Sequence, residues 1–265
     1  MTFYWLYDLP NWLFGIISIG FFVGLGSLGL LASRSWVRRQ HKIDHSHNDI
    51  VGYFLAAVTV FYGITLGLLA VGAWGNYSDV EAKVDREAQN MASLYRDLCG
   101  YPEPEQSLLR EDLRRYTQQV IEVAWPEQQR GVLPTGSGAY LDKFQTDLTS
   151  FEPRTQEQAI IHQESFRQFN DLVESRRARL NSVGSHMPAA MWMLVIVGAL
   201  ITIGATLFFD TASFSLHMWL TLCLSSLLGL MIFLIGVLDH PFRGKTSVSA
   251  HPITLVYDQL MKSTM

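Results

Sequence analysis

Four long blocks without a charged side chain constrain the fold of this 265-residue chain more than any other feature of its sequence. They cover residues 12–32, 50–74, 189–209 and 216–238, and none contains Asp, Glu, Lys or Arg. A helix of about 20 apolar residues spans the roughly 30 Å of hydrocarbon in a bilayer. The sequence therefore predicts an all-α integral membrane protein with four transmembrane helices.

Aromatic residues near the block ends support these boundaries, because amphipathic rings lie preferentially at the headgroup level of a membrane. No basic residue precedes the first block, and its apolar stretch exceeds the roughly 15 residues of a signal peptide, so we expect it to remain as an anchor. The rings belong to Trp5, Trp12, Trp36, Tyr53, Trp74, Tyr77, Trp192 and Trp219.

The composition excludes several classes of function. A net charge of −4 gives no basic surface of the kind that holds nucleic acid, so no nucleic-acid partner is expected. Cys99 and Cys223 are too few for a disulfide framework or a thiolate metal site. No phosphate-binding loop, dinucleotide glycine pattern, nucleophile elbow or zincin motif occurs. The sequence therefore predicts no enzyme, no catalytic residue and no cofactor.

Between the second and third blocks, apolar residues recur at helical spacing. We expect amphipathic helices at about residues 80–98, 109–123, 140–151 and 160–180, packed as a bundle outside the membrane. The first and fourth are expected to continue into membrane helices, and Pro126 is expected to end the second. The predicted domains are a transmembrane hairpin (1–75), a polar helical domain (76–187), a second hairpin (188–239) and a C-terminal tail (240–265).

The second block carries small residues along one helix face. Separations of 4, 3, 4, 4 and 3 residues from Gly52 to Ala70 place them in one stripe. One interpretation is close packing, since small residues let membrane helices approach each other. The other is the wall of a narrow pore built from several copies of this helix, with Thr59, Tyr62 or Thr65 supplying polar groups. The predicted pore-lining residues are Gly52, Ala56, Thr59, Tyr62, Gly63, Gly67 and Ala70.

A charged motif follows the last block, at Asp239, His240, Pro241, Phe242 and Arg243. An acid and a base at a membrane end can form a gate or a binding site. The alternative is a structural clamp, in which Pro241 stops the helix and Asp239 pairs with Arg243. Other partners available to the motif are Arg176, Arg177 and Arg179.

Other polar residues have simpler interpretations. His41, His45 and His47 suggest a metal-handling protein as a weaker alternative, but neither cysteine is near them and no metal site is predicted. Asn48 is expected to cap the second membrane helix. Glu87 and Glu122 are isolated acids, which we expect to be solvated or ion-paired rather than general bases.

The basic residues around the membrane helices favour two different orientations of the chain in the membrane. The short first loop is basic, with Arg34, Arg38, Arg39 and Lys42, which favours that loop inside and the polar domain on the periplasmic side. Basic residues also lie near membrane ends on the opposite side, and they favour a cytoplasmic polar domain. These are Lys83, Arg86, Arg176, Arg177, Arg179, Arg243 and Lys245.

Several motifs together resemble the bacterial bestrophin-like family of unknown function. The resemblance covers about residues 48–244 and shares the plan of two membrane helices, a helical domain and two more membrane helices. The motifs are EA at Glu87, LYRDL from Leu94, LRRYTQQVIEVAWP from Leu113, NDLVESRRARL from Asn170, PAAMW from Pro188 and LDHPFRG from Leu238.

This resemblance implies a function, because the family is distantly similar to bestrophins, which are pentameric ion channels. In bestrophins the second membrane helix lines the pore and the intervening helices form a cytosolic vestibule. The resemblance therefore implies a homo-oligomer in the bacterial inner membrane that conducts small inorganic ions past residues 52–70. The basic first loop departs from a bestrophin-like orientation, and no acidic calcium clasp is recognisable, so calcium gating is not expected. The alternative is a non-conducting membrane interaction or signalling protein whose helical domain binds a partner.

Overall fold

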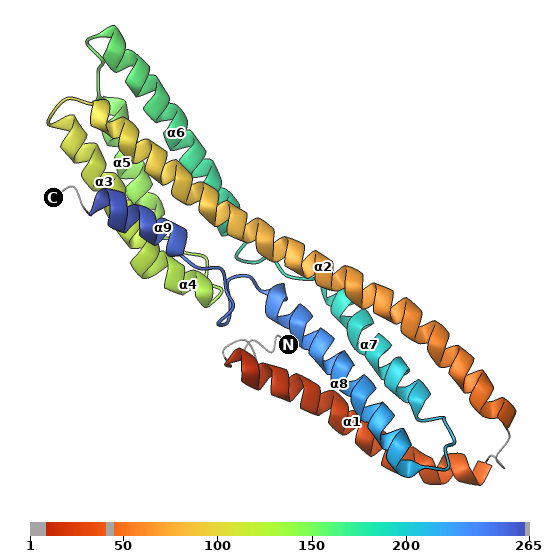
Figure 1. Cartoon of the computed structure of the whole chain (residues 1–265). Helices are drawn as coiled ribbons and strands as arrows, with labels where there is room; N and C mark the ends of the chain where they lie inside the picture. Colours follow the sequence, from red (N-terminus) through yellow and green to blue (C-terminus); the bar gives the residue numbers. More distant parts are fainter. Residues whose placement is uncertain (1–8, 41–44, 263–265) are drawn as a thin grey trace. The chain divides into compact units, whose positions relative to one another are not determined.

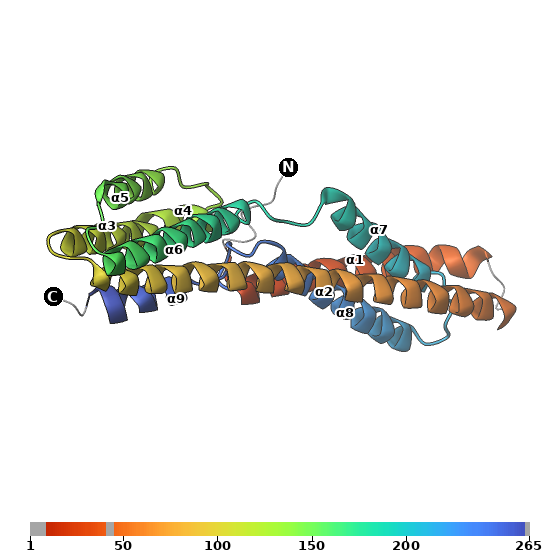
Figure 2. The same cartoon turned by 90° about the horizontal axis from the view of Figure 1, so that it is seen from above.

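The structure is a computed structural model that describes residues 9–40 and 45–262. The described residues form helices joined by turns and loops (Figures 1 and 2). The helices are α1 (Asn11–Gln40), α2 (His45–Asp97), α3 (Glu105–Gln119), α4 (Trp125–Gln129), α5 (Gly138–Ser150), α6 (Gln156–Asn181), α7 (Ala189–Thr206), α8 (Phe214–Asp239) and α9 (His251–Val256). Short 3₁₀ and π turns cover Leu98–Gly100, Val120–Ala124 and Tyr257–Met261.

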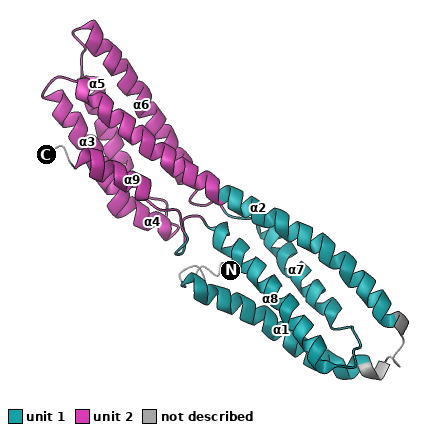
Figure 3. Cartoon of the chain, viewed as in Figure 1, with its two compact units in different colours: residues 1–76, 186–240, 244–246 teal, residues 77–185, 241–243, 247–265 magenta. Residues whose placement is uncertain are grey.

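The chain divides into two compact units (Figure 3). Unit 1 comprises residues 1–76, 186–240 and 244–246, and unit 2 comprises residues 77–185, 241–243 and 247–265. The helix α2 contributes its first part to unit 1 and its last part to unit 2.

Unit 1 holds the predicted membrane spans. Four helices are long and apolar enough to cross a bilayer, in Asn11–Val37, His47–Gly100, Ala189–Thr206 and Phe214–Asp239, and this confirms the four predicted blocks. Helix α1 packs so closely against α8 that a Cβ atom added to Gly229 would lie 2.7 Å from the Cα atom of Ile19. The glycines and serines of these helices therefore let two backbones meet.

The beginning of α2 differs from the sequence prediction. The helix starts at His45, so Asn48 lies within its first turn rather than at the cap position. The Asn48 amide donates to the Asp210 carbonyl oxygen at 2.7 Å and its oxygen accepts from the Asp210 N–H at 3.0 Å. The side chain thus satisfies backbone groups of the α7–α8 turn instead of those of its own helix.

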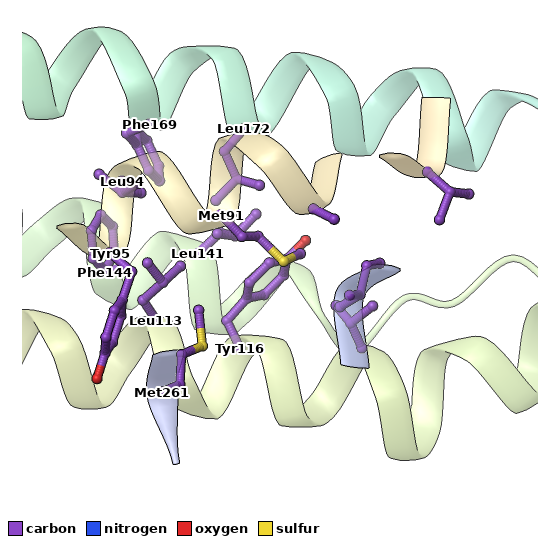
Figure 4. Packing of buried hydrophobic residues seen from close by; sticks show 14 of the residues in the cluster. Met91, Leu94, Tyr95, Leu113, Tyr116, Leu141, Phe144, Phe169, Leu172 and Met261 are labelled. Atoms are coloured by element: carbon purple, nitrogen blue, oxygen red, sulfur yellow. The ribbon is translucent and has the colours of Figure 1, made fainter. Parts of the chain in front are cut away.

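Unit 2 contains the predicted amphipathic helices packed around one apolar core (Figure 4). Two details differ from the expectation. A π turn carries the helical run through Pro126 to Gln129, because the shifted hydrogen bonds accommodate the missing proline N–H. Helix α6 ends at Asn181 and does not continue into α7. The core includes Met91, Leu94, Leu113, Tyr116, Leu141, Phe144, Phe169 and Leu172.

The C-terminal residues also belong to unit 2. No sequence pattern indicated an element after Asp239, but α9 forms and its Ile253 is buried in the core of unit 2. Met261, in the following π turn, is buried in the same core (Figure 4).

Candidate functional site

One face of the membrane part of α2 is buried against its own unit. Tyr62, Leu66 and Ala73 recur at helical spacing and are buried. The Tyr62 hydroxyl donates to the Val195 carbonyl oxygen on α7 at 2.5 Å, and a Cβ atom added to Gly198 would lie 2.3 Å from the Tyr62 ring. This face therefore packs on α7 through a long aromatic side chain.

The small-residue stripe, which we define as Gly52, Ala56, Thr59, Gly63, Gly67 and Ala70, lies on a neighbouring flank of the same helix. Added Cβ atoms at Gly63 and Gly67 would meet no atom within 4 Å, and one at Gly52 would meet only Phe209 at 3.9 Å. The Thr59 hydroxyl donates to the Leu55 carbonyl oxygen of its own helix at 2.8 Å. Among the described residues, nothing covers the middle of the stripe.

The structure separates Tyr62 from the other predicted pore-lining residues. Its ring is buried, whereas Gly63 is exposed on the adjacent flank. The sequence placed Tyr62 with the stripe because it is polar and adjacent. Its hydrogen bond to Val195 and its contact with Gly198 assign it to intramolecular packing.

In the membrane-end motif, Asp239 is buried at the last residue of α8. Its carboxylate accepts from the Met187 N–H at 2.6 Å and from the Trp192 Nε1 at 2.8 Å. The His240 Nε2 atom is 3.8 Å from an Asp239 oxygen. The carboxylate thus ties the end of α8 to the start of α7, which is the geometry of a clamp.

The rest of the motif packs within unit 2. Phe242 is buried and its ring meets Trp125 edge-on at 5.7 Å between centroids. The Arg243 Nη2 atom donates to the Arg130 carbonyl oxygen at 2.7 Å. Gly131, which follows, has a φ of 75° that only glycine adopts readily. The expected pairing of Asp239 with Arg243 is replaced by these separate partners.

A buried ion pair occupies the interior of unit 2. Glu87 and Arg179 are both fully buried, and the guanidinium forms a bidentate pair with the carboxylate through Nε and Nη2. The Tyr116 hydroxyl donates to the same carboxylate at 3.1 Å. The Arg179 Nη1 atom has no hydrogen-bond partner among the described residues, and the guanidinium lies 5.7 Å from the Trp125 ring centroid.

The contacts of the buried ion pair shift the pKa values of Arg179 and Tyr116. Burial is the largest single influence and would lower the pKa of Arg179, but the charges and hydrogen bonds of Glu87 and Tyr116 together outweigh it and raise that pKa above its ordinary value. Burial and the negative charge of Glu87 raise the pKa of Tyr116. Arg179 was expected at a membrane end, and Glu87 was read as an isolated acid. Their pairing completes the core of unit 2 and leaves neither group exposed to act as an acid or a base.

A polar groove of about 450 Å³ lies between α2 and α6 within unit 2. The Asn90 amide donates to the Asp171 carbonyl oxygen at 2.9 Å and to Ser175 Oγ at 3.1 Å at its floor. Lys83 pairs with Asp79 at 2.7 Å and donates to Ser182 at 3.1 Å. Its lining carries both signs of charge.

Of the three histidines that suggested metal handling, the structure describes the side chain of His47. His41 lies outside the described residues, as does the side chain of His45. The His47 Nε2 atom is 2.9 Å from the Phe208 carbonyl oxygen. In the described part of the chain, no group of three His, Cys, Asp or Glu residues is arranged to hold a metal ion.

Comparisons with known proteins agree with this arrangement. The bestrophin-like domain family matches residues 20–253. A variant of a bacterial bestrophin homolog from Klebsiella pneumoniae has a TM-score of 0.68 at 12% identity, covering 93% of this chain and 95% of that one. A second variant has a TM-score of 0.66 at 12% identity, covering 93% and 98% of the two chains.

Identities this low show a shared fold, and a comparison with curated proteins finds no match. The family match, in contrast, extends over most of the sequence and includes all four candidate membrane helices or large parts of them. The chain therefore belongs to the bestrophin-like family and is a bestrophin-like helical membrane protein.

Proposed function

We propose that several copies of this chain assemble around an axis in the bacterial inner membrane as a passive channel for small inorganic ions. The observation that carries the proposal is the uncovered flank of α2, where a Cβ atom added to Gly63 or Gly67 would meet no atom within 4 Å. In the channel, the stripe of each copy faces the shared passage. The resemblance to bestrophins favours five copies.

The chemistry of the stripe suits passive permeation. Its backbone is not shielded by large side chains, and it carries no fixed charge. Hydrophobic constrictions in channels gate by excluding water. Trp74 lies four residues beyond Ala70, on the same helix face, and its ring is exposed. We assign the narrowest part of the passage to this ring.

Charge favours one orientation of the channel. The basic loop after α1 is short, and short loops dominate the orientation of a membrane protein, so the polar domain would face the periplasm. The resemblance to bestrophins favours the cytoplasm instead.

The test is substitution of one glycine on each side of α2. Gly63→Leu adds bulk to the stripe without an internal clash. Gly72→Leu is the matched control, because nine residues at about 100° each place Gly72 on the opposite face, where an added Cβ atom also meets nothing within 4 Å. In planar bilayers we expect Gly63→Leu to lower unitary conductance at least tenfold and Gly72→Leu to leave it unchanged.

Three results would contradict the channel. They are silent bilayers with well-folded protein, a strictly monomeric protein, and equal currents in the wild type and Gly63→Leu. The second candidate is a non-conducting interaction protein, favoured by the mixed-charge groove between α2 and α6. In that case Gly63→Leu would change only assembly or stability, and the stripe would serve helix packing.

A further inference from the structure

An apolar groove of about 450 Å³ lies in unit 1 between the start of α2 and the end of α7. Ile50 and Phe54 line one side, and Ile201 and Phe208 line the other. All four of these side chains are exposed, while Gly204 leaves space at the floor because an added Cβ atom would meet nothing within 4 Å. The groove is therefore apolar and open on the part of unit 1 that holds the membrane helices.

The groove begins at one end of the membrane helices of unit 1. Helix α1 ends, α2 begins and α7 ends at the same side of unit 1 (Figure 1). The Trp36 ring meets Phe208 edge-on, with 6.4 Å between the ring centroids. Tryptophan rings lie preferentially at the headgroup level. The groove thus runs from the headgroup level into the hydrocarbon layer.

A cation lies near the end of α1, at the same end of unit 1 as the groove. The Arg34 guanidinium is 4.4 Å from the centroid of the Phe214 ring. Within the described residues, it has no hydrogen-bond or ion-pair partner. Leu207 and Phe209, which flank Phe208 in the chain, line a small cavity together with Arg34, His217 and one acid, Asp210. A planar guanidinium held on an aromatic ring presents its donors to a phosphate in bidentate geometry.

We propose that this groove binds one anionic phospholipid, with an acyl chain between α2 and α7 and the phosphate at Arg34. An apolar groove and an arginine that lies on an aromatic ring at the same membrane end are the two recognition elements that such a lipid needs.

The geometry of α2 argues for lipid rather than a second copy of the chain. Phe54 and Gly63 are nine residues apart, which places them on opposite faces of the helix. The groove therefore faces away from the stripe, which faces the shared passage in the channel, so this step rests on the proposed function. The outward face carries bulky apolar side chains suited to acyl chains.

The experiment uses the full chain, purified in mild detergent and depleted of lipid. Phosphatidylglycerol or phosphatidylcholine is added, and bound lipid per chain is measured by mass spectrometry together with the apparent unfolding midpoint. The wild type should retain phosphatidylglycerol preferentially and gain thermal stability from it. Gly204→Phe should lower bound phosphatidylglycerol about tenfold, because its ring fills the groove.

One control and two further variants separate the groove from general effects. Gly20→Phe on α1 also enters open space but lies outside the groove, and it should bind lipid as the wild type does. Ile201→Trp fills the groove from an exposed position and replaces Gly204→Phe if that variant folds poorly. Arg34→Gln should keep lipid bound but reduce the preference for phosphatidylglycerol about fivefold, the effect of one basic residue at a membrane surface.

Unchanged phosphatidylglycerol binding in Gly204→Phe and Ile201→Trp would overturn the proposal. So would dissociation of an oligomer by these variants with normal lipid binding, because the groove would then hold a neighbouring copy. Equal retention of both lipids by the wild type would refute the role of Arg34. Lipid binding is measured without current, so silent bilayers with bound phosphatidylglycerol would refute the channel and leave the lipid site standing.

Discussion

The two parts of α2 differ in burial, and the difference is the opposite of what their composition would predict for a water-soluble protein. In unit 1 the helix is apolar, yet Phe61 is 75% exposed and Leu68 is 69% exposed. In unit 2 the helix is rich in charge, yet Val80, Val84 and Met91 are fully buried. A water-soluble protein does not expose so large an apolar surface. The covering of the first part must come from outside the subunit, whereas the second part is covered by its own chain.

The largest expected effect lies in the covered part. Glu87→Gln should lower the free energy of unfolding by about 3–5 kcal/mol, because it leaves Arg179 as a buried, uncompensated charge. The measurement is denaturant or thermal unfolding of the full chain in detergent. The double variant Glu87→Met with Arg179→Met should lose less than Glu87→Gln alone, since no charge remains unpaired. An unchanged free energy of unfolding in Glu87→Gln would show that the pair contributes nothing to the stability of unit 2.

A matched pair of leucines compares the two parts directly. Leu94 is fully buried in unit 2 and Leu68 is exposed in unit 1. Leu94→Ala should cost about 2–5 kcal/mol of unfolding free energy through the cavity it leaves. Leu68→Ala should change that energy by less than about 0.5 kcal/mol. Equal losses in the two variants, measured in the same detergent, would mean that Leu68 is covered in the assembled protein.

The smallest expected effect is a pH dependence confined to unit 2. Burial lowers the pKa of His162 from its ordinary 6.5, and the Tyr101 hydroxyl lies 2.8 Å from His162 Nδ1. A depressed folded-state pKa favours the neutral ring, so this stability is present above pH 6.5 and is lost as the pH falls through the folded pKa. His162→Gln should therefore flatten the fall of the unfolding midpoint below about pH 6.5. An unchanged pH profile would assign that fall to other groups.

Much of the fold was predictable because its signals are local. Blocks without charge identify membrane helices, and a helical period such as Val80, Val84 and Met91 identifies a buried face. The same period contained an overlooked signal: Glu87 lies seven residues after Val80 and four before Met91, so it shares their buried face. An acid in that register needs a buried partner. Which arginine supplies it depends on how α6 packs in unit 2.

The candidate site was less predictable because its neighbours are distant in sequence. Spacing grouped Tyr62 with the stripe, but its hydroxyl reaches Val195. The sequence allowed Asp239 to pair with Arg243, but its carboxylate binds Met187 and Trp192. All three partners come from α7 or the segment just before it, more than 40 residues away in each case. Hydrogen-bond partners at such separations follow from tertiary packing, which periodicity does not encode.

The sequence by itself determined the membrane helices, the amphipathic helices between them and the position of the small-residue stripe, since each depends on side-chain chemistry repeated along one helix. Tertiary structure alone decided which flank of α2 is covered, where the acid and base of the membrane-end motif bind, and that Glu87 meets Arg179. The physical reason is that burial is a property of neighbours, and in this chain the deciding neighbours belong to other helices.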